Sequence, residues 1–193
     1  MKKLLICALI LLTGAAYAQD AVVVKRDFET IVQYTRKKQI DKVLDMTYPP
    51  LFKIMPKAQM KAMADGMLNG MGIAMIFEEK PLMLKLSPVK KLSAADICLG
   101  SYNQSMIMEF KNPALIDMMT KTKMNGTKIE KLSANKLRMQ GTQYLLAIKD
   151  ANTANTWKYL RYDDQDANIN NKVLSKDIQA TVAQLKANLS KSK

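Results

Sequence analysis

The chain has 193 residues, a formal net charge of +13 and no histidine. The missing histidine excludes Ser-His-Asp and Cys-His catalysis and His-ligated zinc, but it leaves carboxylate and tyrosine chemistry open. The positive excess is scattered lysine with few aromatic residues to stack on bases, so we expect no nucleic-acid partner.

The N-terminal residues 1–18 predict a cleavable secretory signal peptide. Lys2 and Lys3 precede an apolar run at residues 4–12, and residues 16–18 (Ala-Tyr-Ala) form a small-x-small cleavage site. The apolar run is too short to span a bilayer, and no later stretch is long enough. We therefore expect cleavage after Ala18, a periplasmic or secreted protein, and no transmembrane span. Loss of Lys2 and Lys3 leaves 28 basic and 17 acidic residues, a formal net charge of +11.

The mature segment, residues 19–193, has a length that suits a single α+β domain. Cleavage removes Cys7 and leaves Cys98, so the mature chain cannot form an intrachain disulfide. Cys98 lies in an apolar run, and we expect it to be a small buried side chain. The stability of the domain must therefore come from its core.

The first part of the mature segment predicts helices. Residues 24, 28, 31 and 35 recur with helical spacing, which predicts an amphipathic helix over 21–38. A short second helix, capped by Asp41, must end before Pro49 and Pro50. A third helix begins near Pro56 and is expected to end at the Asn-Gly pair of residues 69–70.

The spacing of apolar residues then changes to the alternation by two that is typical of strands. Strands are predicted over 73–79, 82–87, 97–110, 136–140, 142–149 and 156–162, with a helix over 113–124. The last two strands predict a hairpin, and residues 163–171 predict a polar loop. Ser175 is expected to cap a terminal helix whose apolar stripe is Ile178, Val182, Leu185 and Leu189. The sequence thus predicts α+β: N-terminal helices packed on a curved, mainly antiparallel sheet, with a C-terminal helix.

Three segments carry a resemblance to a known fold: FETIVQY, KQIDKVLDMTYPPLF and YLLAIKDANTANTWKYLRYDD. Their order over residues 20–165 resembles the nuclear-transport-factor-like, cystatin-related α+β cone, and exported bacterial proteins of that group. The resemblance implies a curved sheet wrapped on N-terminal helices. It does not choose a function, because the group includes both enzymes and non-catalytic binding modules.

Our main expectation is an exported, non-catalytic binding or interaction protein, with a small apolar ligand or an anionic envelope component as its partner. The first helix should bury Val24, Phe28 and Ile31 against the sheet, and alternation sends Trp157 and Tyr159 to the same side. A cavity lined by aromatic and methionine side chains would suit an apolar ligand. The predicted ligand-binding residues are Phe28, Met63, Met67, Tyr144, Trp157 and Tyr159.

Two alternatives stay open. A carboxylate- and tyrosine-dependent enzyme, isomerase- or hydrolase-like, would place an Asp and a Tyr in an apolar cavity. Its candidate residues are Tyr34, Tyr102, Tyr144, Glu109 and Asp96. The other alternative is a basic protein that associates with anionic cell-envelope surfaces.

Two patterns in the sequence resemble metal-binding sites, but we interpret neither of them as one. Met60, Met63, Met67 and Met71 follow helical spacing and could ligate Cu(I), but we interpret them as an apolar seam. Residues 164–170 place oxygens at alternate positions, as a calcium loop does, but they lack the turn glycine and the bidentate glutamate. We expect no metal and no cofactor.

Overall fold

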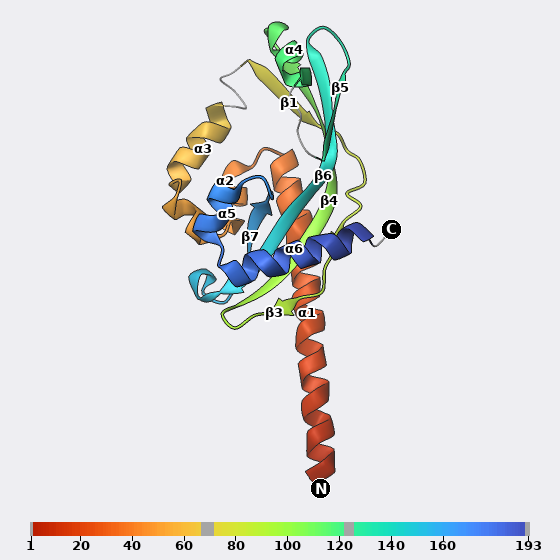
Figure 1. Ribbon diagram of the computed structural model, residues 1–193, viewed down its shortest axis with the longest axis vertical. Helices are drawn as coiled ribbons and strands as arrows, with labels where there is room; N and C mark the ends of the chain where they lie inside the picture. The colour runs from red at the N-terminus through yellow and green to blue at the C-terminus, as the bar shows by residue number, and fades with distance from the viewer. Residues whose placement is uncertain (1, 67–71, 122–125, 192–193) are drawn as a thin grey trace.

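The computed structural model, which describes residues 2–66, 72–121 and 126–191, is built around two long strands (Figure 1). Strand β4 (Ala95–Phe110) and strand β6 (Lys136–Asp150) pair antiparallel along almost their whole length. Short strands pair with their outer edges, and helices cover both faces of the resulting sheet. The described architecture is α+β with a mainly antiparallel sheet and a C-terminal helix, as the sequence predicts.

Three short strands follow one another along the free edge of β4. They are β1 (Ile73–Phe77), β2 (Lys85–Leu86) and β3 (Lys90–Lys91), and all pair antiparallel. The predicted strands at 73–79 and 82–87 are therefore present but shorter, while β3 was not predicted.

Two strands share the free edge of β6. Strand β5 (Thr127–Lys131) pairs with residues 137–141, and strand β7 (Lys158–Tyr162) pairs with residues 144–148. Thr142 and Gln143 lie in the gap between these two ladders. The prediction of two separate strands at 136–140 and 142–149 was wrong, because Gly141 continues the β6 backbone without a break.

Helix α1 (Lys2–Arg36) packs on one face of the sheet, which we call the inner face. Its side chains Val24, Phe28 and Ile31 are buried there, as predicted. Their partners are the strand residues Cys98, Leu145, Ala147 and Tyr159, together with Trp157, which directly precedes β7. The helix begins earlier than the predicted residue 21, and its N-terminal half extends away from the sheet (Figure 1).

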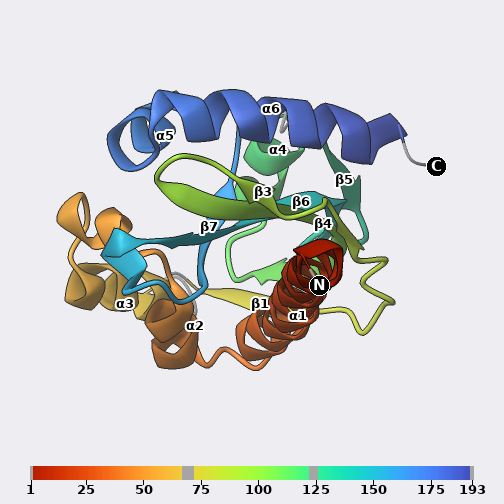
Figure 2. The ribbon, with the colours of Figure 1, turned by 90° about the horizontal axis from the view of Figure 1, so that it is seen from below.

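Helix α6 (Lys176–Lys191) covers the opposite, outer face, as Figure 2 shows. The Ser175 hydroxyl accepts a hydrogen bond from the Ile178 amide at 3.3 Å, which confirms the predicted cap. All four residues of the predicted stripe are buried. They pack on Ile97, Leu99, Leu146, Ile148 and Leu160.

The remaining helices surround the two ends of the sheet. Helix α4 (Ala114–Lys121) packs Ile116 on the methionine-rich end of β4 and β6. Helices α2 (Ile40–Met46) and η1 (Pro49–Lys53) follow α1 and lie near β7, where the Tyr48 amide donates to the Tyr159 carbonyl at 2.9 Å. Helix α3 (Lys57–Asp65) lies against α2 (Figure 1). The predicted end of the third helix at residues 69–70 lies outside the described residues.

The chain after β6 turns through a short 3-10 helix, η3 (Ala151–Thr153), before β7. After β7 it forms helix α5 (Ala167–Val173), where the sequence predicted a polar loop. The Asp166 side chain caps α5 by accepting a hydrogen bond from the Ile169 amide at 3.2 Å. The segment that resembles a calcium loop, residues 164–170, therefore contains the start of α5, and Asp166 is the N-cap of that helix.

Candidate functional site

A cavity of about 440 Å³ opens on the inner face between α1, α2 and β7. Its walls are mostly apolar, which is typical of a small-molecule site of this size. Helix α3 contributes Met60, and the start of α5 closes one side. The apolar lining residues are Ile31, Val43, Leu44, Leu51, Met60, Leu145, Leu160 and Ile169.

A second hollow, of about 290 Å³, adjoins the first along the inner face. Both hollows are lined by Gln104 and Arg161, so they meet at these residues. Five methionines from β1, β4, α4 and β6 line the second hollow, which we call the methionine groove: Met75, Met106, Met108, Met119 and Met139.

Four polar side chains form the floor where the two hollows meet. Tyr102 and Gln104 come from β4, Gln143 from β6 and Arg161 from β7. Tyr102 pairs with Gln143, and Leu145 pairs with Arg161, so strand alternation sends all of these side chains to the inner face. This polar floor, Tyr102, Gln104, Gln143 and Arg161, lies beside the gap between β5 and β7.

The side chains of the polar floor have no hydrogen-bond or ion-pair partner within the described part of the chain. The side chains of Tyr102, Gln104 and Arg161 form no hydrogen bond or ion pair with the described residues, whereas every deeply buried polar atom there is paired. Burial raises the pKa of the Tyr102 hydroxyl, and the nearby positive charges of Arg161 and Arg36 oppose that rise. The floor therefore offers donors to whatever enters the cavity.

Two carboxylates also line the first cavity, and both already bind backbone amides. Asp163 accepts a hydrogen bond from the Gln165 amide at 3.0 Å, and Asp166 caps α5. Both lie after β7, toward the start of α5. Neither forms an ion pair with Arg161 in the described residues.

Three of the predicted ligand-binding residues meet in a closed part of the inner face. The rings of Phe28 and Tyr159 pack edge to face at 5.3 Å, and Trp157 belongs to the same cluster. The Trp157 Nε1 donates to Asp20 at 2.9 Å, and the Tyr159 hydroxyl donates to Asp27 at 2.8 Å. Phe28 and Trp157 are thus core residues, while Tyr159 also lines the cavity.

The other predicted residues lie elsewhere. Tyr144 points to the outer face, where the Lys186 ammonium lies 4.6 Å from its ring centre. Met63 is 50% exposed on α3, a helix with no buried residue. Met67 lies outside the described residues. The predicted apolar seam on this helix was wrong for Met63, because Met60 lines the cavity while Met63 faces solvent. The methionines that line a hollow are mainly strand residues, spaced by two.

The candidate residues for acid–base catalysis are dispersed. Of the five, Tyr102 lines the cavity. Tyr34 packs under the Lys42 ammonium, and Asp96 pairs with Lys149 at 3.3 Å. Glu109 pairs with Lys136 at 3.3 Å on the outer face. No carboxylate from this set joins Tyr102, so these residues do not assemble the expected Asp–Tyr pair.

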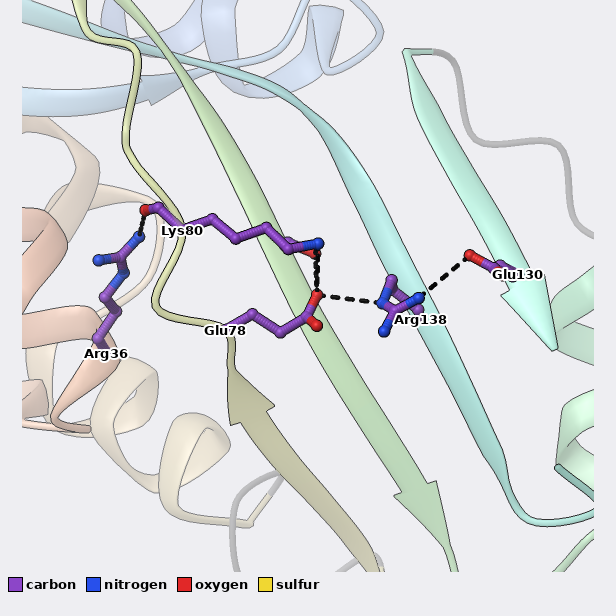
Figure 3. A network of polar contacts seen from close by, with 6 residues as sticks. Arg36, Glu78, Lys80, Glu130 and Arg138 are labelled. Carbon is purple, nitrogen blue, oxygen red and sulfur yellow. Dashed lines mark hydrogen bonds and ion pairs between the residues drawn. The ribbon is translucent and has the colours of Figure 1, made fainter. Parts of the chain in front are cut away.

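The outer face carries a contrasting polar cluster, in which each charged group has a partner (Figure 3). Glu78 lies at its centre and binds the Ser105 hydroxyl, Lys80 at 3.1 Å and Arg138 at 3.1 Å. Arg138 also contacts Glu130 at 3.4 Å. The hydrogen bond from Ser105, with Lys80 and Arg138, lowers the pKa of Glu78 to about 2. This cluster has little capacity left for a ligand.

The sequence did not identify three members of the polar floor: Gln104, Gln143 and Arg161. Polar residues on a strand usually face solvent, and their pattern alone does not place them beside a cavity. A partial signal was present, because Tyr102 and Gln104 interrupt the alternating apolar series on β4 between Cys98 and Met106. The pairing of Gln143 with Tyr102 is seen in the folded sheet.

Comparisons with known proteins leave the site to be interpreted from this chain alone. The chain matches no protein-family model, no curated protein and no solved structure. Within the described residues, no helix has the length and apolarity needed to cross a membrane. The features that bear on function are therefore the cavity, its methionine groove and its polar floor.

Proposed function

We propose that the protein is an exported, non-catalytic binding protein that holds a small ligand with an apolar body in the inner-face cavity. The observation that carries this proposal is the combination of apolar walls with the unpaired polar floor. Apolar walls provide affinity, and a few convergent polar groups fix the orientation of a ligand. In a well-packed core the same polar groups would be hydrogen-bonded to the protein.

Binding of a neutral fluorescent probe, N-phenyl-1-naphthylamine, tests this function. The wild-type protein should bind it saturably at one site. Gln104→Trp, which fills the cavity, should weaken binding about tenfold or more, because the ring occupies the space of the ligand. The matched control is Asn103→Trp, on the adjacent residue of β4 that points to the outer face, and it should change affinity by less than about twofold.

Two results would count against the cavity as the binding site. One is the absence of saturable binding to the wild-type protein. The other is an equal loss in Gln104→Trp and Asn103→Trp, which would indicate a general effect of an added ring on the sheet. Thermal unfolding of both variants shows that each remains folded.

Export is the second part of the proposal, and it rests on the signal-peptide pattern of residues 1–18. Asp20, two residues after Ala18, accepts hydrogen bonds from Trp157 at 2.9 Å and from Lys149 at 3.1 Å. Cleavage after Ala18 would therefore leave α1 tied to the sheet close to its new N-terminus. Intact mass measurement of the exported protein should give Gln19 as its first residue. An exported chain that begins at Met1 would contradict the proposal.

Association with anionic envelope surfaces is a second candidate, favoured by the formal net charge of +11 after cleavage. Such binding to vesicles that contain anionic lipid should weaken steeply from low to physiological salt. Binding that is insensitive to salt would contradict a charge-driven contact.

A further inference from the structure

The polar floor carries a positive charge, that of Arg161. Arg161 lines both hollows, is exposed to solvent, and has no ion pair with a described carboxylate. Tyr102 lies across the same floor, and the charges that act on its hydroxyl are the positive ones of Arg161 and Arg36. The first cavity also has two carboxylates, Asp163 and Asp166, which accept hydrogen bonds from backbone amides and keep their negative charge. Among the described residues that line the methionine groove, Arg161 is the charged one, so the positive charge lies at the groove end of the floor.

A neutral apolar ligand would not satisfy this floor. Filling the cavity displaces water from the Arg161 guanidinium, and burying a charge without a partner is costly. A carboxylate removes that cost, because it accepts two parallel hydrogen bonds from a guanidinium. The Tyr102 hydroxyl and the Gln104 amide can donate to the same anion.

The methionine groove provides the space for an extended apolar tail. Its five methionines come from four elements and meet the polar floor at Gln104 and Arg161. Unbranched thioether side chains adapt to a flexible chain more readily than branched ones. A molecule with its head on Arg161 would therefore direct its tail along this groove.

We propose that the ligand of this cavity is an amphiphilic anion: a single-chain carboxylate whose head binds Arg161 and Tyr102 and whose alkyl tail occupies the methionine groove. This inference rests on the proposed function, since it specifies the ligand of the same cavity. It adds a charge requirement that a purely apolar site does not have.

Two ligands that differ in the head group test it. Dodecanoate and dodecanol, each below its aggregation concentration at neutral pH, compete with N-phenyl-1-naphthylamine for the wild-type protein. Dodecanoate should bind about tenfold more tightly than dodecanol, because the charge-assisted hydrogen bonds are made to the carboxylate alone. Arg161→Gln should lose that preference by weakening dodecanoate about tenfold while changing dodecanol by less than about twofold.

Arg138→Gln is the matched control, because it removes the same charge from the outer face of the same sheet. It should leave the dodecanoate preference within about twofold of wild type. If Arg138→Gln lowers dodecanoate affinity as much as Arg161→Gln does, general charge attraction accounts for binding and the inference is overturned.

The experiment separates this inference from the proposed function. Equal affinity for dodecanoate and dodecanol, unchanged in Arg161→Gln, would overturn the anionic ligand and leave an apolar binding site. Failure of the probe and of both ligands to bind the wild-type protein would overturn both. Tyr102→Phe gives an independent measurement: it should weaken dodecanoate more than dodecanol, and an equal effect on the two would also count against the inference.

Discussion

The inner face contains a filled region and a hollow region built on the same two strands. In the filled region β4 has Gly100, and the Phe28 ring lies so close that an added Cβ would be 2.1 Å from it. In the hollow region β4 has Tyr102 and Gln104, and α1 contributes Ile31 and Thr35 to the wall of the cavity. A face of the sheet is thus filled where a small strand residue meets a large helix residue, and it stays hollow where that match ends.

The polar groups of the two regions differ in whether they have a hydrogen-bond partner in the protein. In the filled region the Tyr159 hydroxyl donates to Asp27 at 2.8 Å. In the hollow region the Tyr102 hydroxyl has no partner among the described residues. Pairing stabilises the fold, whereas unpaired donors are available to a ligand.

Truncation of the ring in the filled region should have the largest effect. Phe28→Ala is expected to lower the free energy of unfolding by about 3–5 kcal/mol, because it leaves a cavity beneath α1. Urea unfolding of the mature protein measures the change. Ile76→Ala, at a side chain that is 52% exposed, is the control and should cost less than about 1 kcal/mol. A near-neutral Phe28→Ala would mean that α1 is packed on a different face.

Adding a single methyl group beneath that ring should have the next largest effect. Gly100→Ala is expected to cost about 1–3 kcal/mol, since its Cβ would overlap the Phe28 ring. In a Phe28→Ala background the cost should fall below about 1 kcal/mol, because the clash with the ring is removed and the contact with Leu86 at 3.1 Å remains. Gly66→Ala is a matched control, as nothing lies within 4 Å of an added Cβ there. An equal cost in both backgrounds would show that the two residues do not meet.

Helical spacing and strand alternation were sufficient to predict the filled region. Val24, Phe28 and Ile31 recur with the period of a helix, and Trp157 and Tyr159 share a face because they are two residues apart. The α+β class and the terminal helix followed from the same patterns. The class and the helix could be predicted because the spacing of apolar residues along the sequence indicates which side chains are buried.

The parts that were not predicted have no apolar period to mark them. Strand β5 is a short edge strand with an exposed polar face, and β3 consists of Lys90 and Lys91, which form a strand through pairing with β4. The position of Arg161 beside Tyr102 depends on the antiparallel register of β6 and β7. Such register is a property of the folded sheet, and a single strand's sequence does not contain it.

Removal of the paired hydroxyl in the filled region should have a moderate effect. Tyr159→Phe is expected to cost about 1–2 kcal/mol, because the half-buried Asp27 carboxylate loses a donor. The ring contact with Phe28 remains, so the change reports on the hydrogen bond. Urea unfolding gives the cost, and a neutral result would imply that Asp27 is already satisfied by solvent and Arg26.

The smallest effect is expected from the same change in the hollow region. Tyr102→Phe should alter the free energy of unfolding by less than about 0.5 kcal/mol, because its hydroxyl has no partner in the described residues to lose. The comparison with Tyr159→Phe is matched in chemistry, and the two tyrosines lie on the same face of one sheet. The effects on dodecanoate binding should have the reverse order: Tyr102→Phe should weaken binding more than Tyr159→Phe does, because the Tyr159 ring lines the cavity but its hydroxyl is held by Asp27. If Tyr102→Phe costs as much stability as Tyr159→Phe without ligand, the Tyr102 hydroxyl is part of the fold and is not available to a ligand.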